Sequence, residues 1–313
     1  MSARPGLPDP SPDAGEASPF EVVRRLAREW PVTAACEAVG VSRSGYYAWR
    51  ERTADGTRKD GSRARDRLRE AIRATFEASK GTYGSPRVHA SLKAAGTRCS
   101  RRRVAGLMRE AGLRATRTRG PRRARPRAGA TAPPVPALVR RCFRPADVGA
   151  PDRAWHADVT SIRTREGWLH LAVVLDAFSR RVLGWATGTA VDADLVVEAF
   201  EMALHRRRPA RGVIHHSDRG SPYASDRFQA RAGRAGVVRS MGRAGTCLDN
   251  AVVESFFATM KAELVRRQSW RTRGELAHAL FAYVEAWYNR HRLHGTLGYL
   301  SPVAFEEAHA TSR

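Results

Sequence analysis

The chain has 313 residues and a net charge of +24 at pH 7, with 55 Lys and Arg against 31 Asp and Glu. No apolar stretch approaches the 18 residues that span a bilayer, and no signal peptide is recognisable, so we expect a cytoplasmic protein rather than a membrane or secreted one. The four cysteines are far apart and fit neither a zinc site nor a disulfide framework.

The positive charge is unevenly distributed along the chain. Residues 1–150 carry 32 Lys and Arg against 14 Asp and Glu, whereas residues 151–313 carry 23 against 17. A genome rich in G and C would explain the preference for Arg over Lys, but not a cation excess of this size. We therefore expect a polyanionic partner, held mainly by the N-terminal half, and the expected location is the nucleoid.

The N-terminal residues predict a short disordered tail and a helix-turn-helix. Residues 1–18 are rich in Pro, Ser, Asp and Gly, a composition typical of disorder. Helices are predicted from Phe20, over Ala34–Val39 and over Arg43–Arg52, the last one capped by Ser42. This outline over residues 19–60 is that of a DNA-binding helix-turn-helix, in which Arg43 and Tyr47 are the candidate DNA contacts.

A second helical unit is predicted over residues 61–115. Leu68, Ile72 and Phe76 recur at helical spacing, and Ser85-Pro86 has the form of an N-cap followed by Pro at the first helical position. Ser100 can cap a further helix that begins with the candidate DNA contacts Arg101 and Arg102. A small helical unit of this kind can also be a mere spacer, but two basic units in tandem favour DNA contact.

An Arg-rich linker is predicted over residues 116–150. Residues 114–134 hold seven arginines and no acidic residue, and they end in Pro and Ala. Such a segment cannot bury a core, and it favours a chain that follows phosphates over a solvated charge run without a partner.

Residues 151–313 predict an α/β domain. Three consecutive strands are expected first, followed by alternating helices and strands and then two long helices. This order is that of an RNase H-like core. The expected strands are 155–164, 168–176, 181–187, 213–217 and 237–241, and the expected helices are 192–207, 225–234, 249–267 and 272–290.

Three acidic residues of this domain lie in positions that suit a two-metal site. Asp158 lies inside the first strand, where an inward-pointing acid is costly without a cation or partner. Asp218 ends the fourth strand, where ligand sites of α/β sheets gather. Glu254 lies on a helix, with 35 residues between it and Asp218. Carboxylates so placed can converge on a pair of hard cations about 3.5–4 Å apart.

The helix that carries Glu254 has two distinct sides. At about 100° per residue, its large apolar residues cluster on one side, whereas Glu254 and Lys261 lie within about 20° of each other on the opposite border. A metal ligand beside a phosphate-binding cation would suit DNA cleavage. By itself, this spacing is equally that of an ordinary solvated ion pair.

Other polar residues compete for the same roles. Asp176 also ends a strand, and we interpret it as a turn residue that bonds the backbone of Ala177-Phe178-Ser179. His215 and His216 precede Asp218, and packing is favoured over metal binding for them. Arg219 is a further candidate DNA contact. The basic and aromatic run 288–294 suits either a DNA contact or a helix C-terminus.

The chain resembles a known family at several of these motifs. It is similar to the transposases of insertion-sequence family three, more narrowly to their second reading-frame product, over roughly residues 20–306. The spaced acidic triad with a lysine seven residues after the glutamate is the most specific element. The matching segments are 40–47, 81–87, 155–160, 216–223, 249–257 with Lys261, and 288–302.

The resemblance implies a retroviral-integrase-type core in which Asp158, Asp218 and Glu254 bind two Mg²⁺ or Mn²⁺ ions. It further implies in-line attack of water or a 3′-hydroxyl at phosphorus without a covalent enzyme intermediate, with Lys261 on the DNA phosphate. The implied partners are double-stranded DNA, further copies of the chain, and an upstream reading-frame product as partner or fusion. A catalytically idle regulator of transposition and a plain metal nuclease are the alternatives.

Overall fold

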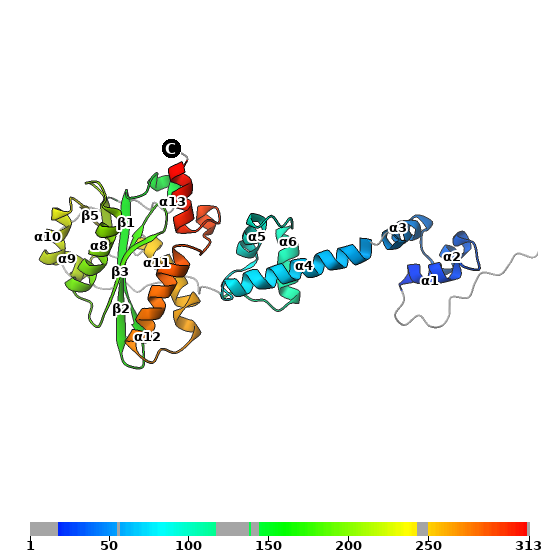
Figure 1. Cartoon of the computed structure of the whole chain (residues 1–313), viewed down its shortest axis with the longest axis horizontal. Helices are drawn as coiled ribbons and strands as arrows, with labels where there is room; N and C mark the ends of the chain where they lie inside the picture. The colour runs from blue at the N-terminus through cyan, green and yellow to red at the C-terminus, as the bar shows by residue number, and fades with distance from the viewer. Residues whose placement is uncertain (1–17, 55–56, 117–137, 139–143, 243–249, 312–313) are drawn as a thin grey trace, which may run out of the picture. The chain divides into compact units, whose positions relative to one another are not determined.

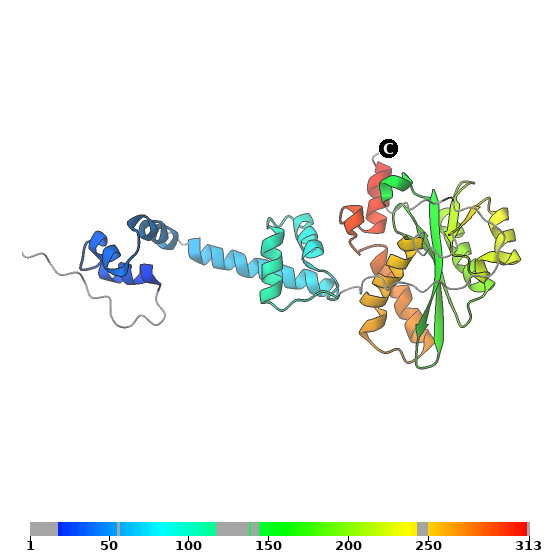
Figure 2. The same cartoon turned by 180° about the vertical axis from the view of Figure 1, so that it is seen from behind.

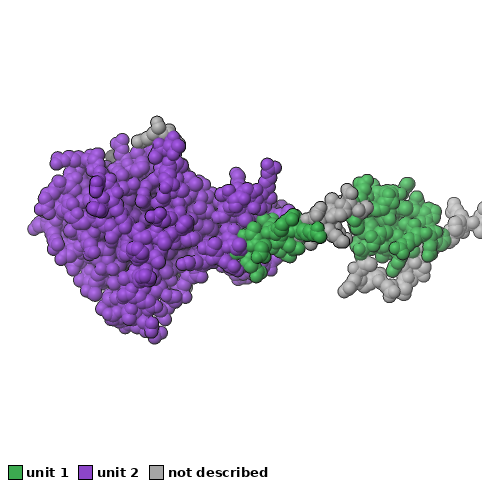
Figure 3. All heavy atoms as spheres, viewed as in Figure 1, with its two compact units in different colours: residues 1–73 green, residues 74–313 purple. Residues whose placement is uncertain are grey.

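The computed structural model describes residues 18–54, 57–116, 138, 144–242 and 250–311. The chain divides into two compact units, residues 1–73 and residues 74–313, coloured separately in Figure 3. The predicted disordered tail lies outside the described residues apart from Ser18, as does most of the predicted Arg-rich linker.

The first unit contains the helices that the N-terminal pattern predicts. They are α1 (Pro19–Leu26), α2 (Val32–Val39) and α3 (Arg43–Ala54). A left-handed glycine, Gly40, ends α2 at a φ of 75°, and Ser42 Oγ accepts a hydrogen bond from the Gly45 amide at the start of α3. A small apolar cluster closes the unit, made by Val23, Ala35, Cys36 and Tyr46.

Helix α4 (Thr57–Ala78) begins in the first unit and ends in the second, where α5 (Ser85–Ala94) and α6 (Arg101–Glu110) follow. Ser100 caps α6, as predicted, because its hydroxyl accepts a hydrogen bond from the Arg103 amide at 3.2 Å. The predicted cap at Ser85 is wrong: α5 begins at Ser85 itself, and Gly84 occupies the N-cap position without a side-chain bond.

The sheet of the second unit has five strands in the order β3-β2-β1-β4-β5. The first three strands pair antiparallel, whereas β4 pairs parallel with β1 and β5 parallel with β4. Each predicted strand is present, and its ends differ from the prediction by one residue at most. The bounds are β1 (Ala154–Arg163), β2 (Trp168–Asp176), β3 (Val182–Gly188), β4 (Ile214–Ser217) and β5 (Val238–Met241).

Helices cover both faces of this sheet, as Figures 1 and 2 show from opposite sides. Helices α8 (Ala193–Arg207) and α10 (Asp226–Arg234) pack on one face, in the cluster that contains Trp155, Ala157 and Phe200. Helices α11 (Ala251–Glu263) and α12 (Arg273–Phe281) pack on the other, in the cluster that contains Leu171, Val173 and Phe256. Side chains of β1 alternate between these two cores, because successive strand residues point to opposite faces.

The structure differs from the expected helices in three places. The segments 249–267 and 272–290 are not uninterrupted α-helices: α11 ends at Glu263 before a 3₁₀ turn, and α12 passes into a π-helix over Ala282–Tyr288. Two short helices, α7 (Pro145–Val148) and α9 (Ser221–Ala224), replace expected irregular segments. A last helix, α13 (Pro302–Thr311), is also additional. In the parts of the chain that the structure describes, no helix is both long and apolar enough to cross a membrane.

Candidate active site

Asp158 lies on the face of β1 that is turned toward α11. Its partner across the antiparallel pair is Val173, which belongs to the core under that helix. The neighbours Ala157 and Val159 point to the opposite core. Asp158 is partly buried, and its Oδ1 accepts a hydrogen bond from the Val159 amide at 2.8 Å. The strand alternation therefore turns one carboxylate into the space between the sheet and α11.

Asp218 directly follows β4, the strand that lies next to β1 in the sheet. The parallel register pairs His156 of β1 with His216 of β4. Asp158 and Asp218 each come two residues after one of these histidines, so the two carboxylates are carried by adjacent strands at the same level of the sheet. Asp218 is exposed, and its Oδ1 accepts a hydrogen bond from the Gly220 amide at 3.0 Å.

Glu254 lies in the first turn of α11, on the exposed side of the helix. The opposite side of α11 buries its apolar residues, as the helical pattern predicts, and fixes the rotation of the helix on the sheet. The buried residues include Val253, Phe256, Phe257 and Met260.

The three acidic residues share one electrostatic environment. The pKa of the Asp158 carboxyl is raised to about 7, chiefly by burial and also by the negative charges of Asp218 and Glu254. The hydrogen bond from Val159 and the charge of Lys261 oppose this shift. Tyr223, which packs against His215 and Phe228, has a pKa raised well above the usual value by burial and by the charges of Asp158 and Asp218. A cation at this point would relieve both the desolvation and the repulsion of Asp158.

The donor set fits a hard divalent cation, since all three side chains offer oxygen ligands. Within the described residues, however, no group of three or more His, Cys, Asp or Glu side chains is already gathered closely enough to hold a metal ion. Carboxylates that repel one another are expected to stay apart until a cation binds, and Asp158 and Asp218 each direct one oxygen to a backbone amide instead.

Lys261 lies beside the acidic residues, as the helix geometry predicts. Its Nζ donates a hydrogen bond to Thr160 Oγ1, on the residue of β1 that shares a face with Asp158. Burial and the charge of Arg266 lower the pKa of Lys261, and the charge of Asp158 opposes this shift. The ammonium group therefore lies beside Asp158 in the direction of the C-terminal end of β1.

A hydrogen-bonded amide fastens the beginning of α11 to β1, and the sequence reasoning did not identify it. The buried Asn250 donates from Nδ2 to the Ala157 carbonyl at 3.0 Å, and its Oδ1 lies 3.1 Å from His156 Nδ1. Because the carbonyl fixes which amide atom is the oxygen, His156 Nδ1 must carry the proton. Burial and the neighbouring His216 lower the pKa of His156 to about 3, so the ring is neutral. Asn250 thus sets the distance between the helix of Glu254 and the strand of Asp158.

Replacing Asn250 by Ala should reduce metal-dependent activity by about 10- to 100-fold, the usual cost of removing a group that orients ligands. The Mg²⁺ concentration for half-maximal activity should rise, because Glu254 is then less well positioned. A Mg²⁺ titration of the reaction rate measures both effects. The control is Gln229→Ala, which removes an amide of α10 on the other face of the sheet. An unchanged Mg²⁺ requirement would contradict a positioning role.

The competing residues have structural roles. Asp176 is fully buried and accepts hydrogen bonds on Oδ1 from the amides of Phe178 and Ser179, at 2.9 and 2.8 Å, which confirms its interpretation as a turn residue. His215 packs among Phe200, Tyr223 and Phe228 on the α8 side, and burial lowers its pKa to about 3. Packing, rather than metal binding, is therefore its role.

The run 288–294 is mostly part of the core, although Arg290 and His291 are exposed. Tyr288 is buried against Phe256, and Asn289 bonds to both the amide and the carbonyl of Val182. Arg292 forms a buried bidentate ion pair with Glu263. Sequence patterns do not find such a pair, because its members lie 29 residues apart on different elements.

Apart from Lys261, the predicted DNA contacts are distributed over several elements: Arg43 and Tyr47 belong to the first unit, and Arg219 directly follows Asp218. Arg43 is exposed at the beginning of α3, and Tyr47 is partly buried below the guanidinium of Arg50. Arg101 and Arg102 are exposed in the first turn of α6. Arg219 is only partly exposed and donates from Nε to the Gly242 carbonyl at 2.9 Å. Their contact with DNA stays a prediction.

Comparison with known proteins identifies the family. A family described as integrase core domain matches residues 149–247, and a second one so described matches residues 254–309. A family described as HTH-like domain matches residues 63–122. The InsF transposase of insertion sequence IS3A from Escherichia coli K12 is 38% identical over 288 residues, which are 92% of this chain and 98% of that protein. The chain belongs to the IS3 family of transposases.

Other relatives agree with this assignment. A 31 kDa protein of insertion element IS600 from Shigella sonnei is 36% identical over 272 residues, which are 87% of this transposase and 97% of that protein. Solved structures are more distant. The catalytic core of HTLV-2 integrase in complex with magnesium has a TM-score of 0.39 and 16% identity, with 51% of this chain and 99% of that one covered. The catalytic core of BIV integrase has a TM-score of 0.39 and 19% identity, with 52% and 99% covered.

The IS3-family transposase therefore combines HTH-like helices with an integrase core of RNase H-like architecture, as the sequence predicts. It is an enzyme of the transposase and integrase class, which transfers polynucleotides.

Proposed function

We propose that this transposase cuts and joins the phosphodiester bonds of insertion-element ends at Asp158, Asp218 and Glu254, which hold two Mg²⁺ or Mn²⁺ ions. The environment of Asp158 is the observation that supports this proposal most directly. The carboxyl group is desolvated, and the charges of two further carboxylates, Asp218 and Glu254, raise its pKa. No ion pair of Asp158 is found among the described side chains, and Lys261, whose charge acts on Asp158, is hydrogen-bonded to Thr160. Such a cluster of carboxylate oxygen ligands favours the binding of hard divalent cations.

Each of these residues has a separate role in the proposed reaction. Asp158 and Asp218, at adjacent strands, bind the metal ions that contact the reacting phosphate. Glu254 on α11 is the third protein ligand. When bound, the ions supply Lewis-acid stabilisation of the oxygens at phosphorus and lower the pKa of an attacking water or 3′-hydroxyl. Lys261 binds a neighbouring phosphate, and Asn250 keeps α11 aligned with β1. No side chain is required as a covalent nucleophile.

The remaining parts of the proposal concern the partners. The basic helices α3 and α6 bind double-stranded DNA through Arg43, Tyr47, Arg101 and Arg102. Their phosphate contacts position the duplex, since such contacts dominate affinity. Two element ends must be brought together before joining, so the working form is an oligomer on DNA, with the upstream reading-frame product as partner or fusion.

Labelled duplexes that carry the DNA flanking the reading frame test the proposal. With Mg²⁺ the full chain should produce cleaved strands and joined products, and both should disappear in EDTA or in the Glu254→Gln variant, while duplex binding remains. Cleavage without joining would identify a plain nuclease. Binding without cleavage, also when the upstream product is added or fused, would identify a regulator and overturn the proposal.

A further inference from the structure

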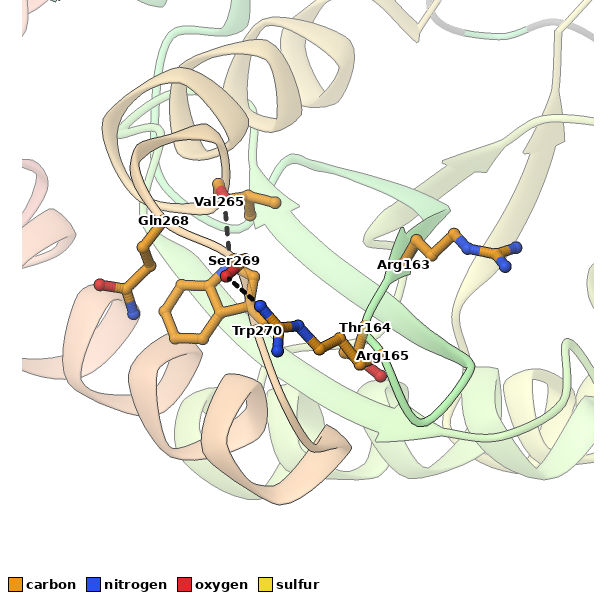
Figure 4. A pocket seen from close by; sticks show the side chains of 7 residues that line it. All are labelled: Arg163, Thr164, Arg165, Val265, Gln268, Ser269 and Trp270. Atoms are coloured by element: carbon orange, nitrogen blue, oxygen red, sulfur yellow. Dashed lines mark hydrogen bonds between the residues drawn. The ribbon is translucent and has the colours of Figure 1, made fainter.

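A cavity of about 340 Å³ opens where β1 ends, beyond the acidic residues. Residues 163–165, at and just after the end of the strand, line one side of it. The other side is lined by the segment that follows α11, through Val265, Gln268, Ser269 and Trp270. Figure 4 shows these side chains, with the Arg165 guanidinium extended toward Ser269. The cavity therefore lies at the end of β1, the strand of Asp158, and at the segment that directly follows α11, the helix of Glu254.

The backbone around the cavity is already satisfied, so its side chains are available. The Arg165 amide donates to the Trp270 carbonyl at 2.9 Å, and the Glu166 amide donates to the Arg271 carbonyl at 3.2 Å. The indole of Trp270 donates to the Val265 carbonyl at 3.0 Å. Arg165 and Ser269 are exposed, and their mutual bond of 3.5 Å is at the limit of a hydrogen bond. A better acceptor would compete with it readily.

The charge around the cavity is positive and uncompensated. The nearby carboxylates Glu166, Glu263 and Glu275 are paired with other arginines. Among the residues that the structure describes, no carboxylate forms an ion pair with the cavity's Arg163 and Arg165 or with the adjacent Arg266. All three side chains are exposed, with few counter-charges near them. Arg165 points toward Ser269, whereas Arg163 points away from the cavity and lies over the ring of Trp168 at its edge (Figure 4). This excess of positive charge at the end of β1 favours an anionic ligand.

An exposed aromatic ring lies at the edge of the same surface. Trp168 begins β2 with 47% of its surface exposed, and the Arg163 guanidinium lies 5.5 Å from its ring centroid. Cations interleaved with exposed aromatic rings are typical of surfaces that bind nucleic-acid strands, because the cations bind phosphates and the rings stack on bases.

We propose that this cavity, together with Arg163 and Trp168 at its edge, binds the phosphodiester backbone of the DNA strand that enters the active site. The proposal rests on the proposed function, because it extends the same DNA path. Arg163 lies five residues beyond Asp158 on β1, which is about 17 Å along an extended strand. Val265 lies eleven residues beyond Glu254, a similar distance of about 16 Å along a helix.

These distances define which phosphate is bound. Successive nucleotides of one strand of a duplex advance by about 3.4 Å, so 17 Å corresponds to about five nucleotides from the reacting phosphate. Lys261 lies between the two positions, since it is bonded to Thr160 of β1. The path thus runs from the acidic residues past Lys261 to Arg165.

The test compares the binding of the full chain to short end duplexes in EDTA, so that no chemistry takes place. The double variant Arg163→Ala/Arg165→Ala should bind about tenfold more weakly, with a salt dependence reduced by about one to two phosphate contacts. The matched control is Arg227→Ala/Arg234→Ala, which removes two exposed arginines from α10 on the opposite face of the sheet. A single Arg165→Lys variant keeps the charge and should keep most of the salt dependence.

A second readout locates the phosphate. One uncharged methylphosphonate linkage is moved along each strand, and the affinity is measured for each position. Wild type and control should lose affinity when the neutral linkage is about five nucleotides from the cleaved position, and the double variant should be insensitive there. The proposal is overturned if the double variant matches the control in salt dependence or stays sensitive at that linkage.

The two proposals fail in different ways. A chain that binds ends but never cuts them still gives a methylphosphonate profile, with positions counted from the end of the element, so this inference can stand while the proposed chemistry fails. A chain that cuts and joins normally but shows no linkage specific to Arg163 and Arg165 overturns this inference alone.

Discussion

Replacing Asp158 by Asn should lower the rate of strand cleavage at least about 1000-fold and at the same time stabilise the metal-free protein. The loss of activity follows because charge stabilisation by a bound ion contributes several kcal/mol, and each 1.36 kcal/mol is a factor of ten in rate. The gain in stability follows because the carboxylate is desolvated and repelled by Asp218 and Glu254, whereas the amide carries no charge.

The stability of the metal-free protein should depend on pH because of Asp158. The pKa of Asp158 is raised from 3.8 to about 7 in the folded chain, so the folded state binds the proton more tightly than the unfolded state. Stability is then greatest below pH 3.8 as far as this group is concerned, and it decreases as the pH rises toward 7. In EDTA, the wild type should therefore lose stability over this range more steeply than the Asp158→Asn variant.

Thermal unfolding at a series of pH values, with EDTA and with Mg²⁺, measures both effects. Mg²⁺ should raise the melting temperature of the wild type more than that of the variant, because bound metal stabilises the folded state only where ligands remain. Asp226→Asn, at an exposed carboxylate in the first turn of α10, is the control. If Asp158→Asn destabilises the metal-free protein, the interpretation of Asp158 as an uncompensated buried acid is wrong.

The strands and the acidic residues could be predicted because their signals are local. Alternation predicts β1 and a nearly continuous apolar run predicts β2, both nearly to the residue, and the position of Asp218 at the end of β4 follows from one short apolar run. The rotation of α11, with Glu254 exposed and Phe256 buried, follows from helical periodicity alone. These predictions need no knowledge of distant partners.

The unpredicted features depend on partners far away in the sequence. In the sequence, Asn250 is an ordinary residue before a helix. Its role depends on His156 of β1, which lies 94 residues earlier in the chain and contacts it only in the folded structure. Helix α12 passes into a π-helix, and the π-turn widens the helix where Tyr283 and Tyr288 enter the core. Ser85 was expected to cap α5 because it precedes a Pro, but Gly84 adopts the extended conformation of the N-cap instead.

The buried ion pair between Glu263 and Arg292 should contribute more to stability than the exposed pairs. The two side chains are only 3% and 5% exposed, and Arg292 donates to both carboxylate oxygens, with Nε at 2.9 Å from Oε2 and a terminal nitrogen at 2.7 Å from Oε1. The Tyr283 hydroxyl donates to the same carboxylate at 2.9 Å. Removing only the cation leaves an unpaired negative charge in a buried site, which is the costly case.

Arg292→Met should therefore lower the free energy of unfolding by about 3–5 kcal/mol, as measured by urea denaturation. Glu263→Gln/Arg292→Met should regain most of this loss, because the amide oxygen still accepts the Tyr283 hydrogen bond and no charge is left buried. Arg271→Met, which removes the 80% exposed partner of Glu275, should change stability by less than about 0.5 kcal/mol. A double variant as unstable as Arg292→Met would mean that packing, not the stranded charge, causes the loss.

The same pair connects stability with the active site. Glu263 is the last residue of α11, nine residues after Glu254. Asn250 fastens the beginning of this helix to β1, and Arg292 fastens its end to the segment after the π-helix. A helix held only at its beginning should let Glu254 and Lys261 move relative to Asp158. We therefore expect Arg292→Met to raise the Mg²⁺ requirement even at temperatures where it is fully folded, and the double variant to restore it.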